Sequence, residues 1–391
     1  MGLGANIMKK ALMMAHVASM IDLFNMDNIH ILQDMGYEVD VACNFEHGSV
    51  TSRQRVNEFK QELISQGIHV YHIPVPRSIT AIGDIMKSYH IIKQLAKKNH
   101  YDIVHCQSPI GGVIARLACK KARKHGTKVI YVAHGFHFYK GASIKNWLLF
   151  YPIEKYYARY TDCLITMNHE DYNLAKRKMN QAKHIKYIPG VGIDTRKINS
   201  INVDIDSKRK ELGIPVDSIV IVSVGELNKN KNHEVIIKAL AKINNPDIHY
   251  IICGKGPLKD YLMKLSKELH IDQNVHILGY RKDVIEILKS SDIFAFPSIR
   301  EGLSVSMMEA MAAGLPVVCS EIRGNTDLIK DGENGYVVDY KDIQMFSMKL
   351  DTLYRNEQAR ENMGNYNKKY IYSFDSKKVN EIMKVLYSSL Q

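Results

Sequence analysis

The sequence predicts an α/β protein made of two doubly wound parallel-sheet domains. Short apolar runs alternate with helical patterns along most of the 391 residues, as in the βα units of an open parallel sheet. The chain is long enough to bury two separate cores. The alternation pauses between Pro189 and Pro215, where Gly190, Gly192 and a charged run interrupt it. This pause predicts a boundary between two domains.

The elements follow from the apolar runs in chain order. The expected strands of the first half are residues 11–15, 39–42, 69–73, 103–106, 129–132, 163–167 and 185–188, with helices such as 56–66 and 85–97 between them. The second half restarts with a strand at 219–224 and has further strands at 293–296 and 315–319. We expect a first domain at 1–195, a linker at 196–215, a second domain at 216–372 and a terminal helix within 373–391. Ligands of such sheets bind in the strand-to-helix loops, at the carboxyl ends of the strands.

Positive charge is concentrated in the first half of the chain. Residues 1–190 hold 25 Lys and Arg against 14 Asp and Glu, whereas the remainder holds 28 against 27. Such an excess indicates an anionic partner, either nucleic acid or a membrane surface. No nucleic-acid-binding motif is present. We therefore expect the first domain to contact an anionic membrane surface, and we expect no nucleic-acid partner.

Cysteine usage and hydropathy indicate the compartment. Six cysteines occur without a CxxC pair, and five of them fall in predicted strands, which is typical of a reducing cytoplasm without disulfides or a metal site. No apolar run approaches the roughly 20 residues that span a bilayer. The start of the chain is similar to a weak signal peptide, but His16 and Asp22 interrupt it, and a first strand explains it better. The expected location is the cytoplasm, peripherally at the inner face of the cell membrane.

The stretch that carries most chemistry is PSIREGLSVSMMEAMAAGLPVVCSE, at residues 297–321. Gly302 permits a tight turn, and the amides of residues 302–306 would open a helix, where free amides bind anions. Glu301 and Glu309 are eight positions apart and can flank one ligand, such as a polyol that carries a phosphate. The alternative is that Glu301 caps the helix and Glu309 is a solvated surface residue.

This stretch resembles the E-x7-E signature of the large fourth family of retaining glycosyltransferases, which share the GT-B architecture of two Rossmann-like domains facing a cleft. The resemblance covers essentially the whole chain. It is closest to bacterial enzymes of capsule and exopolysaccharide assembly, through the segments AHGFHFYKGASIKNWLLFYPIEKYYARYTD and SVGELNKNKNH. It implies that Glu301 contacts sugar hydroxyls, that Glu309 contacts a ribose, that the anomeric configuration is retained, and that the terminal helix crosses back to the first domain.

The resemblance also implies a nucleotide-sugar site in the second domain. The family commonly has Gly-Arg-Leu, three residues and then Lys; Gly225, Leu227 and Lys231 match, but Glu226 stands where Arg is usual. Lys231 can place a cation against the leaving diphosphate, whereas Glu226 puts the role of that Arg in doubt. The expected donor-binding residues are Gly225, Lys231, Gly254, Gly256, Tyr280, Arg281, Glu301, Gly302, Leu303, Ser304, Val305 and Glu309. Arg281 could equally be a surface cation.

Loops of the first domain supply the remaining candidates. His134 follows a predicted strand, and in the resembled family a His at this position hydrogen-bonds the donor sugar; alternatively it satisfies a local backbone group. We take His134, Glu301 and Lys231 as the catalytic residues. His16, Ser19 and His137 are candidates for acceptor binding, although Ser19 could instead cap a helix. The first loop lacks GxGxxG, which disfavours NAD.

Two further segments have open interpretations. Asp204-Ile205-Asp206 is a DxD string, which holds a divalent ion in glycosyltransferases of another fold class, but here it lies in the expected linker. We therefore expect no metal and no cofactor. Aromatic and basic residues alternate over 140–160, and 116–128 is strongly basic; both suit a membrane interface or, alternatively, core-packing helices with a solvated lysine face.

These observations predict a glycosyltransferase, specifically a hexosyl- or N-acetylhexosaminyl-transferase. Its expected donor is a UDP-sugar, and its expected acceptor is a lipid-linked saccharide or another glycan of cell-surface polysaccharide biosynthesis. Retention is expected from the resemblance. Metal independence is expected because Lys231 and the helix-start amides of residues 302–306 can meet the charge of the leaving group. Two alternatives remain open: a non-catalytic GT-B partner or activator, which Glu226 favours, and a nucleotide-sugar epimerase of the same fold.

Overall fold

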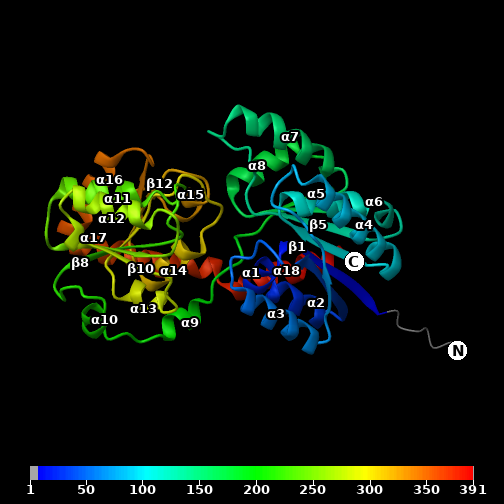
Figure 1. Ribbon diagram of the computed structural model, residues 1–391, viewed down its shortest axis with the longest axis horizontal. Coiled ribbons are helices and arrows are strands. Elements are labelled where there is room, and N and C mark those ends of the chain that lie inside the picture. Colours follow the sequence, from blue (N-terminus) through cyan, green and yellow to red (C-terminus); the bar gives the residue numbers. More distant parts are fainter. Residues whose placement is uncertain (1–7, 391) are drawn as a thin grey trace. The chain divides into compact units, whose positions relative to one another are not determined.

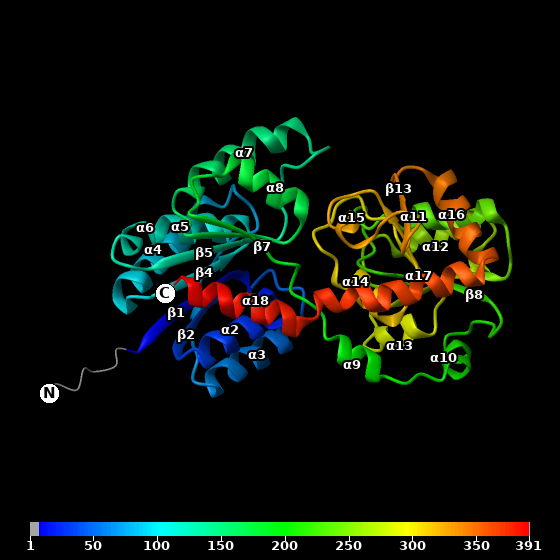
Figure 2. The same cartoon turned by 180° about the vertical axis from the view of Figure 1, so that it is seen from behind.

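The computed structural model describes residues 8–390, and the chain divides into two compact units. The first unit comprises the chain up to Val191 together with the segment from Val379 onward, and the second comprises Gly192–Lys378. Figures 1 and 2 show a parallel sheet with helices on both faces in each unit. The predicted fold class, α/β with two doubly wound parallel sheets, is therefore confirmed.

The first unit is built on a seven-stranded parallel sheet of order β3-β2-β1-β4-β5-β6-β7. Its strands are β1 (Lys9–Val17), β2 (Tyr37–Asn44), β3 (His69–His72), β4 (Ile103–Gln107), β5 (Lys128–Ala133), β6 (Cys163–Thr166) and β7 (His184–Tyr187). Its helices are α1 (Ala18–Phe24), α2 (Met26–Asp34), α3 (Arg53–Ser65), α4 (Ile82–Asn99), α5 (Pro109–Ala118), α6 (Lys120–Arg123), α7 (Ile144–Ala158) and α8 (His169–Lys178). The strand order reverses between β1 and β4, which is where ligands of doubly wound sheets bind.

The two faces of this sheet carry separate cores. Alternate residues of β1 point to opposite faces, so Met13 packs with α1, α2 and α3, whereas Leu12 and Met14 pack with α4 and α5. The terminal helix α18 (Ser376–Ser389) completes the first of these cores, because Val379, Met383, Leu386 and Tyr387 are buried in it. The expected helix within 373–391 is thus present, and its side chains from Val379 onward belong to the first unit.

The second unit has a six-stranded parallel sheet of order β10-β9-β8-β11-β12-β13. Its strands are β8 (Ile219–Val224), β9 (Ile248–Cys253), β10 (Val275–Gly279), β11 (Ile293–Phe296), β12 (Val317–Ser320) and β13 (Gly335–Val338). Its helices are α9 (Thr195–Ser200), α10 (Ile205–Glu211), α11 (His233–Ile243), α12 (Lys259–Glu268), α13 (Val284–Lys289), α14 (Val305–Ala313), α15 (Asn325–Leu328), α16 (Ile343–Arg355) and α17 (Glu357–Tyr370), with short 3-10 turns at Asp272–Asn274 and Ile371–Phe374.

Two local assignments differ from the sequence-based expectation. Residues 196–215 are not an extended linker, since they form most of α9 and all of α10 and lie within the second unit. The charged residues of α10 gave no apolar pattern in the sequence, but Lys208, Arg209 and Glu211 form ion pairs with neighbouring elements in the structure. The first strand also runs further than expected, so His16 lies in β1 and Ser19 lies in α1.

Candidate donor and acceptor sites

The second unit gathers glycines at the carboxyl ends of β8 and β9, which are neighbours in the sheet. A Cβ atom on Gly254 would lie 1.8 Å from the carbonyl oxygen of Gly225, and one on Gly256 would lie 2.5 Å from that of Leu227. No residue with a side chain fits at either position without moving the backbone. The two loops therefore pack backbone against backbone, and glycine is required for that packing.

Lys231 and Glu301 form an ion pair at this end of the sheet. The Nζ atom of Lys231 lies 2.7 Å from Oε1 of Glu301 and 4.6 Å from the ring centroid of Phe296. The lysine and glutamate side chains are only 18% and 15% exposed. Gly225 leaves room for the lysine stem, because a Cβ there would lie 3.0 Å from two of its carbons. The structure thus brings together three predicted donor-site residues from β8 and β11.

Helix α14 begins next to this pair. Ser304 is its N-cap and accepts a 3.4 Å hydrogen bond from the amide of Met307, so Glu301 is not the cap. That alternative for Glu301 is wrong. Gly302, Leu303 and Val305 are partly buried around the start of the helix. The first-turn amides of a helix lack internal acceptors and carry partial positive charge, which suits a phosphate.

Glu309 lies one turn into α14 and is partly buried, so the alternative of a solvated surface residue is also wrong. Burial raises the pKa of its carboxyl group to about 7. Within residues 8–390, its carboxylate has no hydrogen-bond or ion-pair partner that would offset the loss of hydration. A partly buried carboxylate without a partner is suited to a ligand that donates hydrogen bonds, such as a ribose diol.

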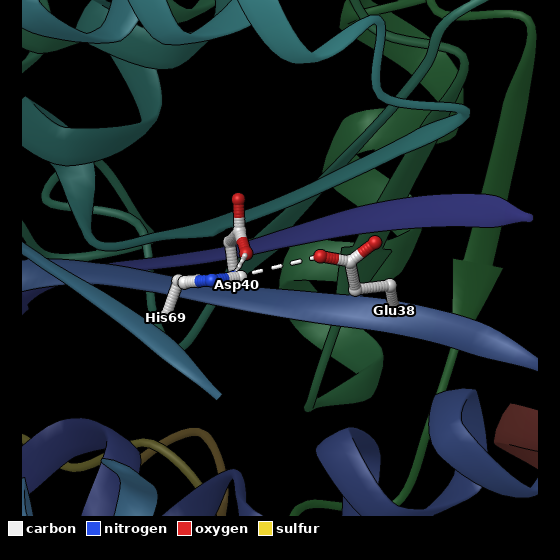
Figure 3. A group of neighbouring side chains, drawn as sticks. All are labelled: Glu38, Asp40 and His69. Carbon is white, nitrogen blue, oxygen red and sulfur yellow. Dashed lines mark hydrogen bonds and ion pairs between the residues drawn. The ribbon is translucent and has the colours of Figure 1, made fainter. Parts of the chain in front are cut away.

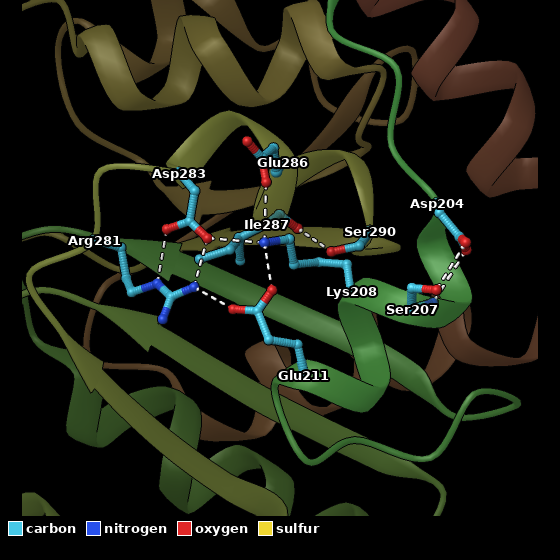
Figure 4. A network of polar contacts seen from close by, with 9 residues as sticks. All are labelled: Asp204, Ser207, Lys208, Glu211, Arg281, Asp283, Glu286, Ile287 and Ser290. Atoms are coloured by element: carbon cyan, nitrogen blue, oxygen red, sulfur yellow. Dashed lines mark hydrogen bonds and ion pairs between the residues drawn. The ribbon is translucent and has the colours of Figure 1, made fainter.

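Tyr280 and Arg281 differ from each other in their surroundings. Tyr280 is 69% exposed, whereas Arg281 donates to Asp283 at 2.8 Å and pairs with Glu211 at 2.8 Å. Figure 4 shows that Lys208 joins the same network, with Asp283 and Glu286 each 3.0 Å from its Nζ atom. These acidic neighbours raise the pKa of Arg281. The network fastens α10 to the loop before α13, a contact that the sequence did not indicate.

The first aspartate of the DxD string, Asp204, has a local structural role. Asp204 is the N-cap of α10 and accepts hydrogen bonds from the amide and the hydroxyl of Ser207, at 3.1 and 2.8 Å (Figure 4). Its carboxylate is therefore used in helix capping.

The first unit places its candidates at the carboxyl ends of β1, β4 and β5, which are adjacent in the sheet. His134 is partly buried, and its Nε2 atom lies 2.6 Å from Oε1 of Gln107 at the end of β4. Burial, reinforced by His16, lowers the pKa of His134 to about 4, so its imidazole is neutral at physiological pH. His134 is thus held by a side chain and not by a local backbone group.

A pocket of about 520 Å³ opens beside these strand ends. His16, Arg77, Ser108, His137 and Phe150 are among its lining residues, and the rings of His137 and Phe150 are tilted against each other with centroids 4.6 Å apart. Two of the three predicted acceptor residues, His16 and His137, therefore share one pocket. The sequence did not identify Ser108 as a pocket residue, because only its backbone conformation distinguishes it from other serines.

Ser19 is not among the residues that line this pocket. It is buried inside α1, where its hydroxyl accepts a 3.1 Å hydrogen bond from the amide of Val50. The alternative of a helix cap is wrong as well, since the N-cap of α1 is Val17 and has no side-chain cap bond.

One group of side chains in the described residues has the spacing of metal ligands: Glu38, Asp40 and His69, with one donor atom of each within 4.8 Å of the others (Figure 3). Nδ1 of His69 lies 3.2 Å from Asp40 and 3.5 Å from Glu38, and Lys10 lies 3.2 Å from the second oxygen of Glu38. The group lies near the amino ends of β2 and β3, whereas the pocket lies at the carboxyl ends of the strands. A hydrogen bond between His69 and Asp40 and an ion pair between Lys10 and Glu38 account for contacts within the group.

The segments expected at a membrane differ in exposure. On α7, the apolar side chains of Ile144, Leu148 and Leu149 are 77%, 73% and 42% exposed. Arg116, in contrast, is buried and pairs with Glu154 at 2.8 Å, so it does not contribute to a basic surface. No helix in the part of the chain that the structure describes is long and apolar enough to cross a membrane.

Two doubly wound parallel-sheet domains are the architecture of the GT-B class of glycosyltransferases. Comparison with known proteins agrees. The model of the family described as "Glycosyl transferases group 1" matches residues 204–370, and that of the family described as "Glycosyl transferase 4-like" matches residues 10–168. EpsD of Bacillus subtilis strain 168, provisionally named as a glycosyltransferase, is 34% identical over 384 residues, with 97% of both chains covered. The chain belongs to the glycosyl transferases group 1 family and is a glycosyltransferase.

Two further comparisons are informative. The UDP-Gal:alpha-D-GlcNAc-diphosphoundecaprenol alpha-1,3-galactosyltransferase of Escherichia coli is 30% identical over 347 residues, which cover 85% of each chain. The crystal structure of Anabaena HepE in complex with UDP-glucose has a TM-score of 0.76 at 20% identity, covering 97% of this chain and 99% of that one. The second likeness shows a shared GT-B fold.

Proposed function

We propose that this glycosyltransferase transfers a hexosyl or N-acetylhexosaminyl group from a UDP-sugar to a lipid-linked saccharide during assembly of a cell-surface polysaccharide. The proposed donor site rests on the ion pair of Lys231 and Glu301, whose atoms are 2.7 Å apart beside the start of α14. The relative from E. coli is named for a UDP-sugar donor and a lipid diphosphate acceptor, which supports the substrate class.

The donor residues have separate roles in this proposal. When the bond between the anomeric carbon and the β-phosphate oxygen breaks, UDP leaves with the bonding electrons and gains negative charge. Lys231 and the first amides of α14 stabilise that charge and take the part that a metal ion plays in other transferases. Glu301 accepts hydrogen bonds from the sugar hydroxyls, and Glu309 accepts them from the ribose.

The first unit supplies the acceptor side. His134 contacts the transferred sugar through its neutral imidazole, and the pocket lined by His16 and His137 receives the acceptor. The acceptor hydroxyl oxygen forms the new bond to the anomeric carbon, and its proton passes to the departing β-phosphate oxygen of UDP. The configuration at the anomeric carbon is retained.

Membrane association is a further part of the proposal. The exposed apolar side chains of α7 and the basic excess of the first half suit a peripheral position on an anionic bilayer at the inner face of the cell membrane. Flotation with vesicles of 30% phosphatidylglycerol at low salt tests it. We expect binding that weakens as salt is added, and an Ile144→Ser/Leu148→Ser variant should bind less. Absence of flotation at low salt would contradict this part.

The function is tested by incubating the protein with UDP-glucose, UDP-galactose, UDP-GlcNAc and UDP-GalNAc, each with and without a GlcNAc-diphosphate lipid. We expect UDP release from one donor that depends on the lipid, and a product heavier by one sugar. Conversion of the donor to an isomer without acceptor would instead indicate an epimerase. No turnover of any donor, without UDP binding, would favour the non-catalytic alternative that Glu226 suggests.

A further inference from the structure

The pocket of the first unit has two polar atoms without a partner in its wall. Nδ1 of His16 and Oγ of Ser108 are enclosed, and neither has a hydrogen-bond partner within residues 8–390. Both residues line the same pocket, at the ends of the neighbouring strands β1 and β4. An enclosed polar atom without a partner lowers the stability of a fold. Two of them at one pocket indicate a ligand that supplies the missing bonds.

The backbone of Ser108 is a second, independent observation. Its φ of 67° and ψ of 154° lie in a region that is populated almost exclusively by glycine. Gly111 leaves space for its hydroxyl, because a Cβ at that position would lie 2.9 Å from the Oγ atom of Ser108. Glycine would occupy position 108 with less strain. A serine there indicates that the hydroxyl has a use that outweighs the strain.

The lining residues indicate the chemistry of the ligand. Arg77 is the one arginine or lysine among the residues that line the pocket, and no carboxylate is among them, so the wall is poorly suited to a highly charged group. Burial, with the nearby charge of Arg77, lowers the pKa of His16 and keeps its ring neutral. A serine hydroxyl and a neutral imidazole can each pair with a hydroxyl group, and the ring of Phe150, which is tilted against that of His137, offers an apolar face. That combination suits a saccharide.

We propose that Ser108 and His16 form a hydroxyl-binding subsite that holds the terminal sugar of the acceptor, with the sugar ring against Phe150. The subsite rests on the proposed function, since it assigns the acceptor end of the same reaction. It adds a specificity-determining residue, Ser108, and a ligand class, a neutral hexose or N-acetylhexosamine ring.

The test combines binding, transfer and stability. Trp147 is the single tryptophan of the chain and lies on α7 together with Phe150, so its fluorescence reports binding of a GlcNAc-diphosphate lipid with a short alkyl chain in the absence of donor. Ser108→Gly removes the hydroxyl and the backbone strain together. We expect its Tm to rise, its Kd and KM for this lipid to weaken roughly tenfold, and its UDP affinity to stay unchanged.

Ser88→Ala is the matched control, because Ser88 is also buried with an unpartnered hydroxyl but lies on α4, outside the lining of the pocket. It should leave the Kd and KM for the lipid unchanged. Wild-type binding by Ser108→Gly, equal losses in both variants, or failure of the wild type to bind the lipid would each overturn the subsite. If no donor is turned over while Ser108→Gly alone loses binding, the proposed function fails and the subsite stands.

Discussion

The Nε2 atom of His134 lies 2.6 Å from the Oε1 atom of Gln107, and the orientation of that amide is set far from the pocket. Asn25 donates to the carbonyl of Met20 at 2.7 Å, so its Oδ1 atom must accept, and it accepts from the amide nitrogen of Gln107. The oxygen of Gln107 therefore faces His134. It follows that His134 carries its proton on Nε2 and leaves Nδ1 as an acceptor.

This series of hydrogen bonds predicts how Gln107→Glu changes the pH dependence of sugar transfer. In the wild type, the pKa of His134 is about 4, so its ring stays neutral between pH 6 and 9 and should leave no inflection there. A carboxylate at position 107 favours the imidazolium and raises that pKa. We expect kcat of the variant to fall as pH drops through the new pKa, with UDP affinity maintained. Identical pH profiles for both proteins would contradict the assignment.

The pair of Lys231 and Glu301 predicts non-additive losses. Glu301→Ala should lower kcat at least 100-fold, because the sugar loses its acceptor and Lys231 loses its partner. Lys231→Ala should weaken UDP binding about tenfold, or by roughly 1.4 kcal/mol. The double variant should lose less than the sum of both, measured as free energies from kcat/KM. Lys238→Ala is the control, since Lys238 pairs with Glu234 on the exposed surface of α11 and its loss should be nearly neutral.

Glu309 predicts a gain in stability when it is neutralised. Its pKa of about 7 in the folded state exceeds the ordinary value of 4.5, so ionisation costs folding free energy. The cost is absent below pH 4.5, grows between 4.5 and 7, and is complete above 7, where it amounts to roughly 3 kcal/mol. Glu309→Gln should therefore raise the free energy of unfolding at pH 8 and have little effect at pH 4.5, in denaturant titrations. The same variant should bind UDP more weakly, and a loss of stability at pH 8 would contradict this account.

The contacts of Lys208 predict that replacing it destabilises the protein at neutral pH and does so less at acidic pH. Its side chain is 11% exposed, and its ammonium group lies within 3.0 Å of Glu211, Asp283 and Glu286. Lys208→Met leaves Glu286 without this cation and Glu211 and Asp283 with Arg281 alone. Because the carboxylates are partly exposed, we expect a cost of about 1 kcal/mol. Hydrogen bonds from Arg281, and to a smaller extent from Lys208, lower the pKa of Asp283, so this stabilisation is present at neutral pH and is lost as the pH falls below the ordinary value of 3.8. The variant should thus lose stability at pH 7 and lose less on acidification, whereas Lys264→Met, on an exposed pair, should match the wild type.

The sequence predicted the strands well and the polar networks poorly. The run at 293–296 coincides with β11, because a buried parallel strand is apolar on both faces and stands out in any sequence. The residues around Glu301 were found because they lie in one continuous motif. Gln107 and Asn25 were missed, since they are 82 positions apart and only the fold brings their side chains together. Lys208 and Asp283 were missed for the same reason, at a separation of 75 positions.

Ser108 shows a different limit of sequence reasoning. Its left-handed φ is set by the turn between β4 and α5, and a serine before a proline usually indicates an ordinary extended residue. The roles of the predicted donor and acceptor residues remain predictions, to be decided by the variants above.

The placement of α18 has a consequence for how the protein is made. Val379, Met383, Leu386 and Tyr387 fill the core that Met13, Ile29 and Leu32 begin, and the hydroxyl of Tyr387 lies 2.7 Å from Nδ1 of His105. During synthesis, β1 and α2 leave the ribosome well before α18, so the apolar interior that they share with α18 cannot close until α18 has followed. Chains truncated before Val379 would expose that interior and should aggregate. The whole second unit is therefore synthesised before the first unit can complete its core.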